Sequence, residues 1–308
     1  LLRQCRKQGV KTVLINGRIS SRSYPRYRLI KPFFRRVLAD VDRFCMQSEE
    51  SSRRLVDLGG DSARVTVTGS LKFDSLELPT TTLAHGKPRE RVLRFFRFSP
   101  NRTVVVAGST VRGEETSVLR AFARVKSSIP SALLVLAPRQ PQRFGEVERL
   151  AKDSGFVTVN RSELPIDAEP RADVVILDSV GELAQLYQVA TAVFVGGSLA
   201  DHGGHNILEP AVFGKPIVFG PHMQNFKEIS DAFLSNDAGV QVQSERELAE
   251  ALLDLTTDPV RRVRLGAAAR ALVEANRGAK NKTLEFVSEL LPFHPPSGAV
   301  IRHFRLVH

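Results

Sequence analysis

Apolar, β-branched segments alternate with amphipathic helical segments along almost the whole chain. Runs of this kind, apolar without period-two alternation, are typical of parallel strands that helices cover on both faces. Ten runs fit the pattern, from VKTVLING near the N-terminus to GVQVQS after residue 238. Between them lie helical patterns such as SEESSRRLVDLG and SERELAEALLDLT, which open on Ser followed by Glu, a common helix start. The alternation predicts an α/β fold with doubly wound, Rossmann-like sheets.

A change of composition divides the chain in two. The stretch between Gly69 and Asn101, GSLKFDSLELPTTTLAHGKPRE with its flanks, carries Pro, Thr and Gly without strong periodicity. Three strand candidates precede it and seven follow it, and 308 residues suffice for two domains. We therefore expect the remaining part of a first domain over 1–75, a linker over 76–100, a complete second domain over 101–275, a crossover helix over 276–291 and an unassigned tail over 292–308.

The bulk composition excludes several classes of protein. Two cysteines, Cys5 and Cys45, give neither a disulfide framework nor a metal cluster, which favours a reducing cytoplasm. No signal peptide is visible, and no apolar run approaches the roughly 18 residues that span a bilayer. The chain does not begin with Met, and its first ten residues, LLRQCRKQGV, have the pattern of the later part of a helix. We expect it to be a fragment of a longer protein.

Almost the whole net charge of +11 lies in the first 54 residues, which carry 14 Lys or Arg against 4 Asp or Glu. Within GRISSRSYPRYRLIKPFFRRV, aromatic residues are interspersed among the basic ones. This mixture fits an anionic membrane face or a phosphorylated lipid. It also fits nucleic acid phosphates or an ordinary solvated surface. The candidate contacts are Arg18, Arg22, Arg26, Arg28, Lys31, Arg35 and Arg36.

The segment from Gly196 to Pro221 carries the strongest functional pattern. TAVFVGG ends a buried strand, and HGGHN opens a helix that we expect to begin near His205 or Asn206. The free N–H groups and positive dipole end of a helix start bind phosphate. A plain tight connection is the alternative, but two GG pairs cost stability unless something binds. The predicted phosphate loop comprises Ser198, Gly203, Gly204 and His205.

The same helix places an amide and a carboxylate on one face. Asn206 and Glu209 are three residues apart, so both lie one turn above the anion site, where ribose hydroxyls would lie. Pro210 is tolerated because the first turn of a helix has no partner for its missing N–H. A phosphate site at the start of the helix, with a ribose site one turn further along, predicts a nucleotide site.

Further candidates follow other strands, and open α/β sheets bind ligands at the carboxyl ends of strands. AGSTVRGEE offers a second anion loop, and LAPRQPQRF places a guanidinium at another strand end. DSVGEL, over residues 178–183, either holds a base edge by its backbone or is a plain capped helix. We expect no metal and no other cofactor, since HExxH, DxD and paired ligand carboxylates are missing. The residues concerned are Gly108, Ser109, Thr110 and Arg139.

With these residues in hand, the chain resembles the 3-deoxy-D-manno-octulosonic acid (Kdo) transferases of lipopolysaccharide synthesis, two-domain GT-B glycosyltransferases. The resemblance rests, over roughly residues 10 to 230, on NGRISSRSYPRY, GSLKFD, AGSTVRGEE, APRQPQRF, GELAQLY, FVGGSLADHGGHNILEPA and GPHMQNFKEI. It implies CMP-Kdo as donor, a lipid A precursor as acceptor and no metal. It also implies that CMP contacts Pro138, Arg139, Val180, Gly181, Glu182, Asn206, Ile207, Leu208 and Glu209.

Some positions depart from the family pattern. The chain reads PRQPQR, with Gln140 and Gln142, where the family usually has PRHPER, and Val180 stands where Met is common. The family's general-base glutamate and its membrane anchor are expected upstream of Leu1, so this polypeptide alone should transfer little. No catalytic residue is therefore assigned within the chain.

The resemblance, together with these patterns, implies an inverting, metal-independent Kdo transfer at the cytoplasmic face of the bacterial inner membrane. The basic segment would hold lipid A phosphates, with no nucleic acid and no obligate protein partner. Two rivals stay open. One is another GT-B enzyme that uses a UDP-sugar, a transferase or an epimerase. The other is a non-catalytic binder of anionic surfaces.

Overall fold

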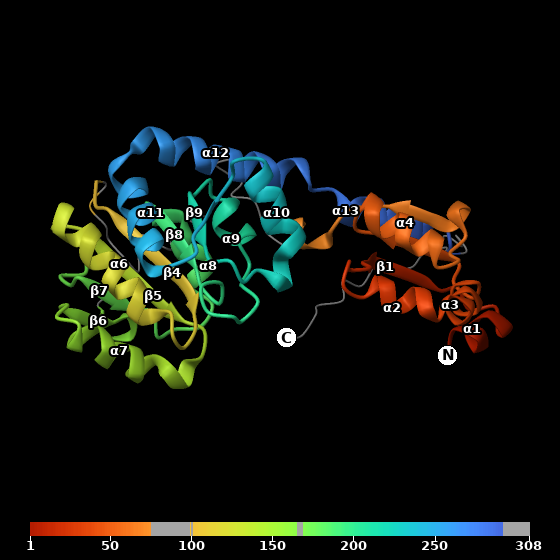
Figure 1. Cartoon of the computed structure of the whole chain (residues 1–308), viewed down its shortest axis with the longest axis horizontal. Helices are drawn as coiled ribbons and strands as arrows, with labels where there is room; N and C mark the ends of the chain where they lie inside the picture. The colour runs from red at the N-terminus through yellow and green to blue at the C-terminus, as the bar shows by residue number, and fades with distance from the viewer. Residues whose placement is uncertain (75–98, 100, 165–168, 292–308) are drawn as a thin grey trace, which may run out of the picture. The chain divides into compact units, whose positions relative to one another are not determined.

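The computed structural model describes residues 1–74, 99, 101–164 and 169–291 (Figure 1). These residues form two compact units, one made of 1–74 with 277–291 and the other ending at Asn276. The predicted linker, apart from Ser99, and the predicted tail lie outside the described residues.

The first unit is built on a parallel three-stranded sheet of order β1-β2-β3. Phe44 and Met46 of the central strand pack against Leu55 and Leu58 to form its core. The Ser48 hydroxyl accepts the Ser51 N–H at 3.2 Å, so the Ser-Glu pattern does cap α4. The elements are α1 (Leu2–Lys7), β1 (Val13–Gly17), α2 (Tyr24–Leu29), α3 (Lys31–Leu38), β2 (Arg43–Met46), α4 (Glu49–Asp57), β3 (Val65–Val67) and α13 (Ala279–Ser288).

The second unit contains a parallel seven-stranded sheet of order β10-β9-β8-β4-β5-β7-β6. Its interior strands are buried on both faces, because their Val, Ile and Leu side chains all find apolar neighbours. Each strand coincides with one of the seven runs predicted after Asn101. The strands are β4 (Val104–Thr110), β5 (Leu133–Pro138), β6 (Thr158–Asn160), β7 (Val174–Ile176), β8 (Ala192–Val195), β9 (Ile217–Phe219) and β10 (Val240–Gln241).

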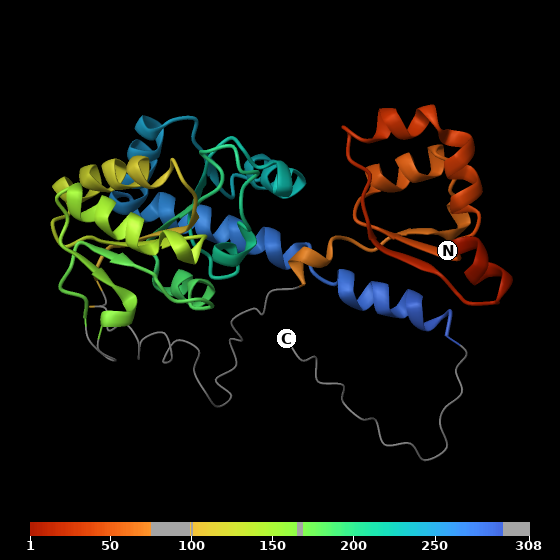
Figure 2. The same ribbon diagram turned by 90° about the horizontal axis from the view of Figure 1, so that it is seen from below.

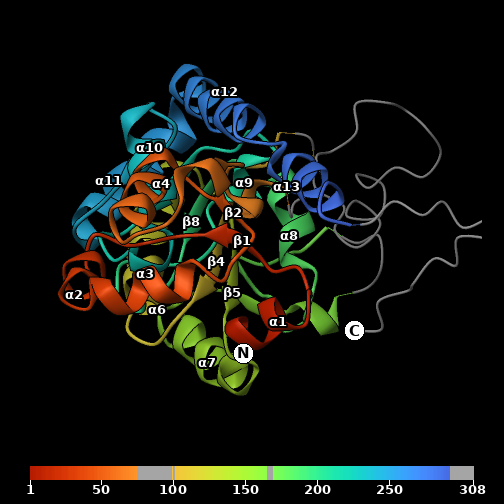
Figure 3. The same cartoon turned by 90° about the vertical axis from the view of Figure 1, so that its right-hand side faces the viewer.

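Helices cover both faces of this sheet (Figures 2 and 3). Successive residues of a strand point to opposite faces, so Ala107 packs in the cluster that includes α6 and α11, while Gly108 faces Tyr187, which follows α8. Figure 3 shows α6, α7 and α11 on one side of the strands, with α8 and α9 on the other. The helices are α6 (Glu115–Ser128), α7 (Phe144–Asp153), α8 (Leu183–Leu186), α9 (Leu208–Ala211), α10 (Lys227–Ser235), α11 (Glu245–Thr257) and α12 (Pro259–Ala275).

A parallel sheet with helices on both faces is a doubly wound arrangement, so the predicted α/β class is confirmed. Strand β4 is the switch point of the larger sheet. The chain proceeds from it to β5 on one side and returns to β8 on its other side. The crevice at the carboxyl end of such a switch point is the general ligand position of open α/β sheets.

Candidate functional site

The loops after β4 and β8 lie side by side at the carboxyl edge of the sheet. Gly108 pairs in register with Val195, at the end of each strand. The two loops approach so closely that a Cβ at Gly196 would lie 2.6 Å from the Ser109 carbonyl oxygen. The two predicted phosphate loops therefore share one edge, next to the end of β5.

The three predicted residues at the end of β4 differ in what they can offer a ligand. Ser109 is half-buried and has a left-handed backbone with φ of 56°, which is uncommon for a non-glycine residue and typical of functional sites. Gly108 is buried, and a Cβ there would lie 2.1 Å from the Tyr187 hydroxyl. Thr110 is fully buried. Gly108 thus serves packing, and Ser109 is the accessible residue of this loop.

A buried carboxylate occupies the loop after β8. Glu114 is 0% exposed, and its two carboxylate oxygens accept five backbone N–H groups. One oxygen accepts Val111 at 3.1 Å and Gly197 at 2.7 Å. The other accepts Ser198 at 2.9 Å, Leu199 at 2.8 Å and Ala200 at 3.1 Å. Of the predicted phosphate-loop residues, Ser198 therefore already gives its amide to an internal carboxylate.

This arrangement corrects the assignment of Ser198. Its side chain is also internal, since the hydroxyl donates to the Val195 carbonyl and accepts the Gly220 N–H at 2.8 Å. With its amide held by Glu114 and its residue 0% exposed, Ser198 has no group to offer a ligand. AGSTVRGEE contains Glu114, but local sequence does not reveal a contact with amides 83 to 86 residues away.

The second glycine pair is explained by close packing. Gly203 and Gly204 have φ of 81° and 74°, which favours glycine. A Cβ at Gly203 would lie 2.4 Å from the Asn225 amide nitrogen, and one at Gly204 the same distance from the Met223 sulfur. The Gly204 N–H donates to the Gly197 carbonyl at 2.7 Å. The pair therefore seats the loop on the segment after β9, a role that the sequence did not indicate.

The helix that was expected near His205 or Asn206 begins instead at Leu208 and ends at Ala211. The Asn206 side-chain oxygen accepts the Leu208 N–H at 3.2 Å, which starts the helix two residues late. Leu208 and Ile207 are both 0% exposed, so their side chains belong to the core. Pro210 does lie in the first turn, as expected. A four-residue helix supplies little dipole, so the phosphate needs another source of positive charge.

Arg139 offers a positive charge at the end of β5. It follows Pro138 at the end of β5, its side chain is exposed, and its N–H donates to the Thr110 carbonyl at 2.9 Å. Across β4, the Asn206 amide donates to the Glu209 carboxylate at 3.2 Å, although Asn206 lies before α9 and not on it as expected. Glu209 and His205 are half-buried and within the electrostatic reach of Arg139.

The titration of these groups reflects a shared, partly dehydrated environment. Burial raises the pKa of Glu209, while the hydrogen bond from Asn206 and the charge of Arg139 oppose the rise. Burial lowers the pKa of His205, and the charge of Arg139 lowers it further. Burial raises the pKa of the Tyr187 hydroxyl, and the charge of Glu209 adds to this. At this edge, therefore, Arg139 acts electrostatically on both a half-buried imidazole and a half-buried carboxylate.

The loop after β7 is more exposed. Val180 is 84% exposed and Gly181 has φ of 92°, so their backbone is open to solvent. The Glu182 carboxylate is held internally, by the Ser179 hydroxyl at 2.5 Å and by Arg161 at 3.2 Å. Of the predicted VGE contacts, the backbone of the first two residues is available, while the Glu182 side chain fixes the loop.

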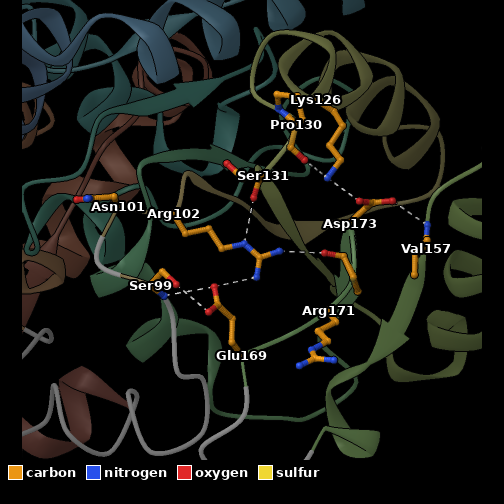
Figure 4. A pocket seen from close by; sticks show the side chains of 11 residues that line it. Ser99, Asn101, Arg102, Lys126, Pro130, Ser131, Val157, Glu169, Arg171 and Asp173 are labelled. Carbon is orange, nitrogen blue, oxygen red and sulfur yellow. Dashed lines mark hydrogen bonds and ion pairs between the residues drawn. The ribbon is translucent and has the colours of Figure 1, made fainter.

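A cavity at the opposite, amino end of the strands is shown in Figure 4. Its residues precede β4, β5, β6 and β7, and most of its charged side chains pair with one another or with backbone groups. Arg102 donates to the carbonyls of Ser131, Pro170 and Ala172 at 2.7 to 3.1 Å and pairs with Glu169 at 3.3 Å. Ligands of open α/β sheets bind at the other end, so we assign this cavity to stability.

The basic segment forms a surface on α2 and α3 of the first unit. All seven predicted basic residues are exposed. Leu29 and Phe33 beside them are also exposed, at 84% and 61%. Asp57 accepts the Tyr24 hydroxyl at 2.7 Å and pairs with Lys31 at 3.1 Å. Five of the seven basic residues lie on α2 and α3 together with Leu29 and Phe33, and the exposed side chains of these two helices are here called the α2–α3 surface.

Within the described part of the chain, no three His, Cys, Asp or Glu residues gather closely enough to hold a metal ion. Nor does any helix of the described ranges combine the length and apolar character needed to cross a membrane.

Known proteins share both the sequence and the fold. Residues 1–75 match the 3-deoxy-D-manno-octulosonic-acid transferase (kdotransferase) family model. The chain is 33% identical to the transferase of that name from Bordetella pertussis, covering 94% of this chain and 66% of the relative. For Haemophilus influenzae the values are 32%, 94% and 67%. A bifunctional glycosyltransferase/methyltransferase of Fusobacterium nucleatum is 34% identical, and the chain spans 38% of its length.

Comparison with solved structures shows the same similarity. The C-terminal CMP-Kdo binding domain of WaaA from Acinetobacter baumannii superposes with a TM-score of 0.56 at 32% identity, covering 60% of this chain and 96% of that one. A UDP-GlcNAc 2-epimerase from Neisseria meningitidis gives 0.58 at 15% identity over 93% of this chain and 72% of its own, which shows a common fold alone. The chain belongs to the 3-deoxy-D-manno-octulosonic acid (Kdo) transferase family.

Proposed function

We propose that the parent protein of this chain transfers Kdo from CMP-Kdo to a lipid A precursor, with inversion and without a metal. Family membership supports the enzyme class. The likeness of the second unit to a CMP-Kdo binding domain supports the donor. The chain spans about two thirds of the Bordetella and Haemophilus relatives, so the complete activity is proposed for the whole protein.

One observation supports this proposal most strongly: the carboxyl ends of β5 and β8 bring together Arg139, Asn206 and Glu209. In this proposal Glu209 accepts hydrogen bonds from the ribose hydroxyls. Asn206 orients that carboxylate rather than touching the phosphate, because its amide already donates to Glu209. Arg139 faces the phosphate, and the exposed backbone at Val180 and Gly181 holds the base edge.

The proposed reaction places charge where Arg139 can stabilise it. The acceptor hydroxyl attacks the anomeric carbon of Kdo, the bond from that carbon to the phosphate oxygen breaks, and its electron pair leaves with CMP. The proton of the hydroxyl passes to a general base, a role to which no residue of this chain is assigned. A guanidinium that meets the growing phosphate charge stabilises the transition state more than the ground state.

The α2–α3 surface is the proposed contact with the anionic face of the inner membrane and with lipid A phosphates. Exposed basic residues combined with exposed Leu29 and Phe33 suit the headgroup region of an anionic membrane. We therefore propose the cytoplasmic membrane face as the location of the parent protein. Nucleic acid and obligate protein partners are not part of the proposal.

A nucleotide titration tests the donor site. CMP should raise the unfolding temperature of the 308-residue chain more than UDP does, and Glu209→Ala should abolish most of that rise. Glu250→Ala removes an exposed carboxylate from α11 and serves as the matched control. Undiminished CMP binding in Glu209→Ala refutes the ribose assignment. Preference for UDP favours the other GT-B class, and no response to either nucleotide favours an anionic-surface binder.

A vesicle assay tests the membrane contact. Replacing Arg26 and Arg35 with Ala should weaken binding to phosphatidylglycerol vesicles about 25-fold, from on the order of 1 kcal/mol for each basic residue. The control replaces exposed Arg124 and Arg246 of the second unit and should leave binding nearly unchanged. Equal loss in both double variants would mean that net charge alone, rather than the α2–α3 surface, determines binding.

A further inference from the structure

Two adjacent glutamates at the start of α6 are buried but have no place in the proposed chemistry. Glu114 is 0% exposed and Glu115 is 1% exposed. A buried carboxylate costs stability unless hydrogen bonds and opposite charge compensate for its lost water. Both residues are compensated by groups from loops of the candidate site, and each uses a different loop.

Glu114 holds the loop after β8. Its carboxylate accepts four successive amides, from Gly197 to Ala200, at 2.7 to 3.1 Å. Successive backbone N–H groups that converge in this way form an anion-binding concavity. Here an internal carboxylate fills the concavity. It thereby fixes the strand-to-loop turn from which the chain continues to Asn206 and Glu209.

Glu115 holds the loop after β5. Its two oxygens pair with the two terminal nitrogens of Arg143, at 2.6 and 3.2 Å, in a two-point contact of high directional strength. Arg143 is 5% exposed and lies four residues after Arg139. A further contact at 3.2 Å joins Arg143 to Glu146 of α7. Glu115 therefore fixes the turn that carries Arg139.

We propose that Glu114 and Glu115 are positioning residues that set the spacing between the cation at the end of β5 and the carboxylate after β8. Because the two glutamates are neighbours on one rigid turn, the two loops share a single frame. The frame presents Arg139 and Glu209 to one nucleotide at a fixed separation. This inference rests on the proposed function, since it names CMP as the ligand whose two ends are held.

The test uses CMP affinity in variants that keep side-chain shape. Glu114→Gln places an NH₂ group against backbone donors, and Glu115→Gln removes the charge opposite Arg143. Each should weaken CMP binding about tenfold or more in titration calorimetry, well below the unfolding temperature, comparable to the loss of one charge-assisted hydrogen bond. Glu115→Asp, which keeps the charge, should restore part of the affinity.

A stability control separates positioning from general weakening. Val125→Ala creates a cavity at a fully buried position of the same helix, away from both loops, so it should lower the unfolding temperature and leave CMP affinity unchanged. Unchanged CMP affinity in folded Glu114→Gln and Glu115→Gln would overturn the proposal. If Glu114→Gln does not fold, Glu115→Gln decides alone.

Hydrogen exchange without nucleotide distinguishes this inference from the function on which it rests. Glu114→Gln should accelerate exchange of amides 197–200, and Glu115→Gln that of 139–143, while Val125→Ala accelerates neither. If the unsubstituted chain does not bind CMP, the proposed donor site is refuted. If exchange stays slow at both loops in the Gln variants, the positioning role is refuted, whether or not the unsubstituted chain binds CMP.

Discussion

The contact between Gly108 and Tyr187 offers a quantitative test of how the end of β4 is built. A Cβ at Gly108 would lie 2.1 Å from the Tyr187 hydroxyl, and Tyr187 is 1% exposed, so it has little room to move. Overpacking of this kind costs about 1–3 kcal/mol. Gly108 does not have a positive φ, so Ala would otherwise fit its backbone. The expected loss for Gly108→Ala is therefore about 1–3 kcal/mol of unfolding free energy.

Removing the hydroxyl should remove most of the loss. The next nearest atoms to that Cβ are ring carbons of Tyr187 at 3.0 and 3.2 Å. In a double-mutant cycle by urea unfolding, Gly108→Ala should cost much less in the Tyr187→Phe background, with a coupling of about 1 kcal/mol or more. CMP affinity should be unchanged in the double variant. Additive losses would refute the packing account, and lost CMP affinity would return Gly108 to the phosphate loop.

Three more predictions concern stability. Burial raises the pKa of Glu209, so the folded state binds the proton of this carboxyl more tightly than the unfolded state does. The free energy of unfolding that the buried carboxylate costs the protein therefore grows as the pH rises above the ordinary pKa of 4.5. The unfolding free energy of Glu209→Gln relative to that of the unsubstituted chain should therefore increase from about pH 4 to about pH 7. A difference that stays constant over this range contradicts the reasoning. Arg102→Met should cost about 2–3 kcal/mol in urea unfolding, because it strips donors from buried carbonyls, without changing CMP affinity. Ser244→Ala should cost about 1 kcal/mol through the lost cap on the Glu247 N–H, and no loss would show that the cap is unimportant.

The sequence predicted the sheet well because its strands are decided by local apolar runs. TVVVAGS and TAVFVGG became β4 and β8, which are buried on both faces. The contact between Asn206 and Glu209 was predicted from helix spacing and is present, but Asn206 lies before α9, so it does not arise from two positions on one helix. Ser48 and Ser244 also cap their helices as the local pattern indicated.

Most of what the sequence missed depends on contacts between distant residues, and the start of α9 is the local exception. Glu114 fills the amide loop from 83 residues away, so no local pattern reveals that Ser198 is occupied. The start of α9 was misplaced because Asn206 bonds the Leu208 N–H and delays the helix. The second glycine pair resembled a phosphate loop, but Asn225 and Met223 account for its lack of side chains.

Hydrogen exchange with and without CMP measures the central claim most directly, since it locates the nucleotide on the chain. Nucleotide should slow exchange at the ends of β4, β5 and β7 and in the segment around Glu209. The cavity lined by Arg102 and Asp173 at the other end of the sheet should not respond. Protection confined to that cavity, or to the α2–α3 surface, would contradict a nucleotide site at the carboxyl edge.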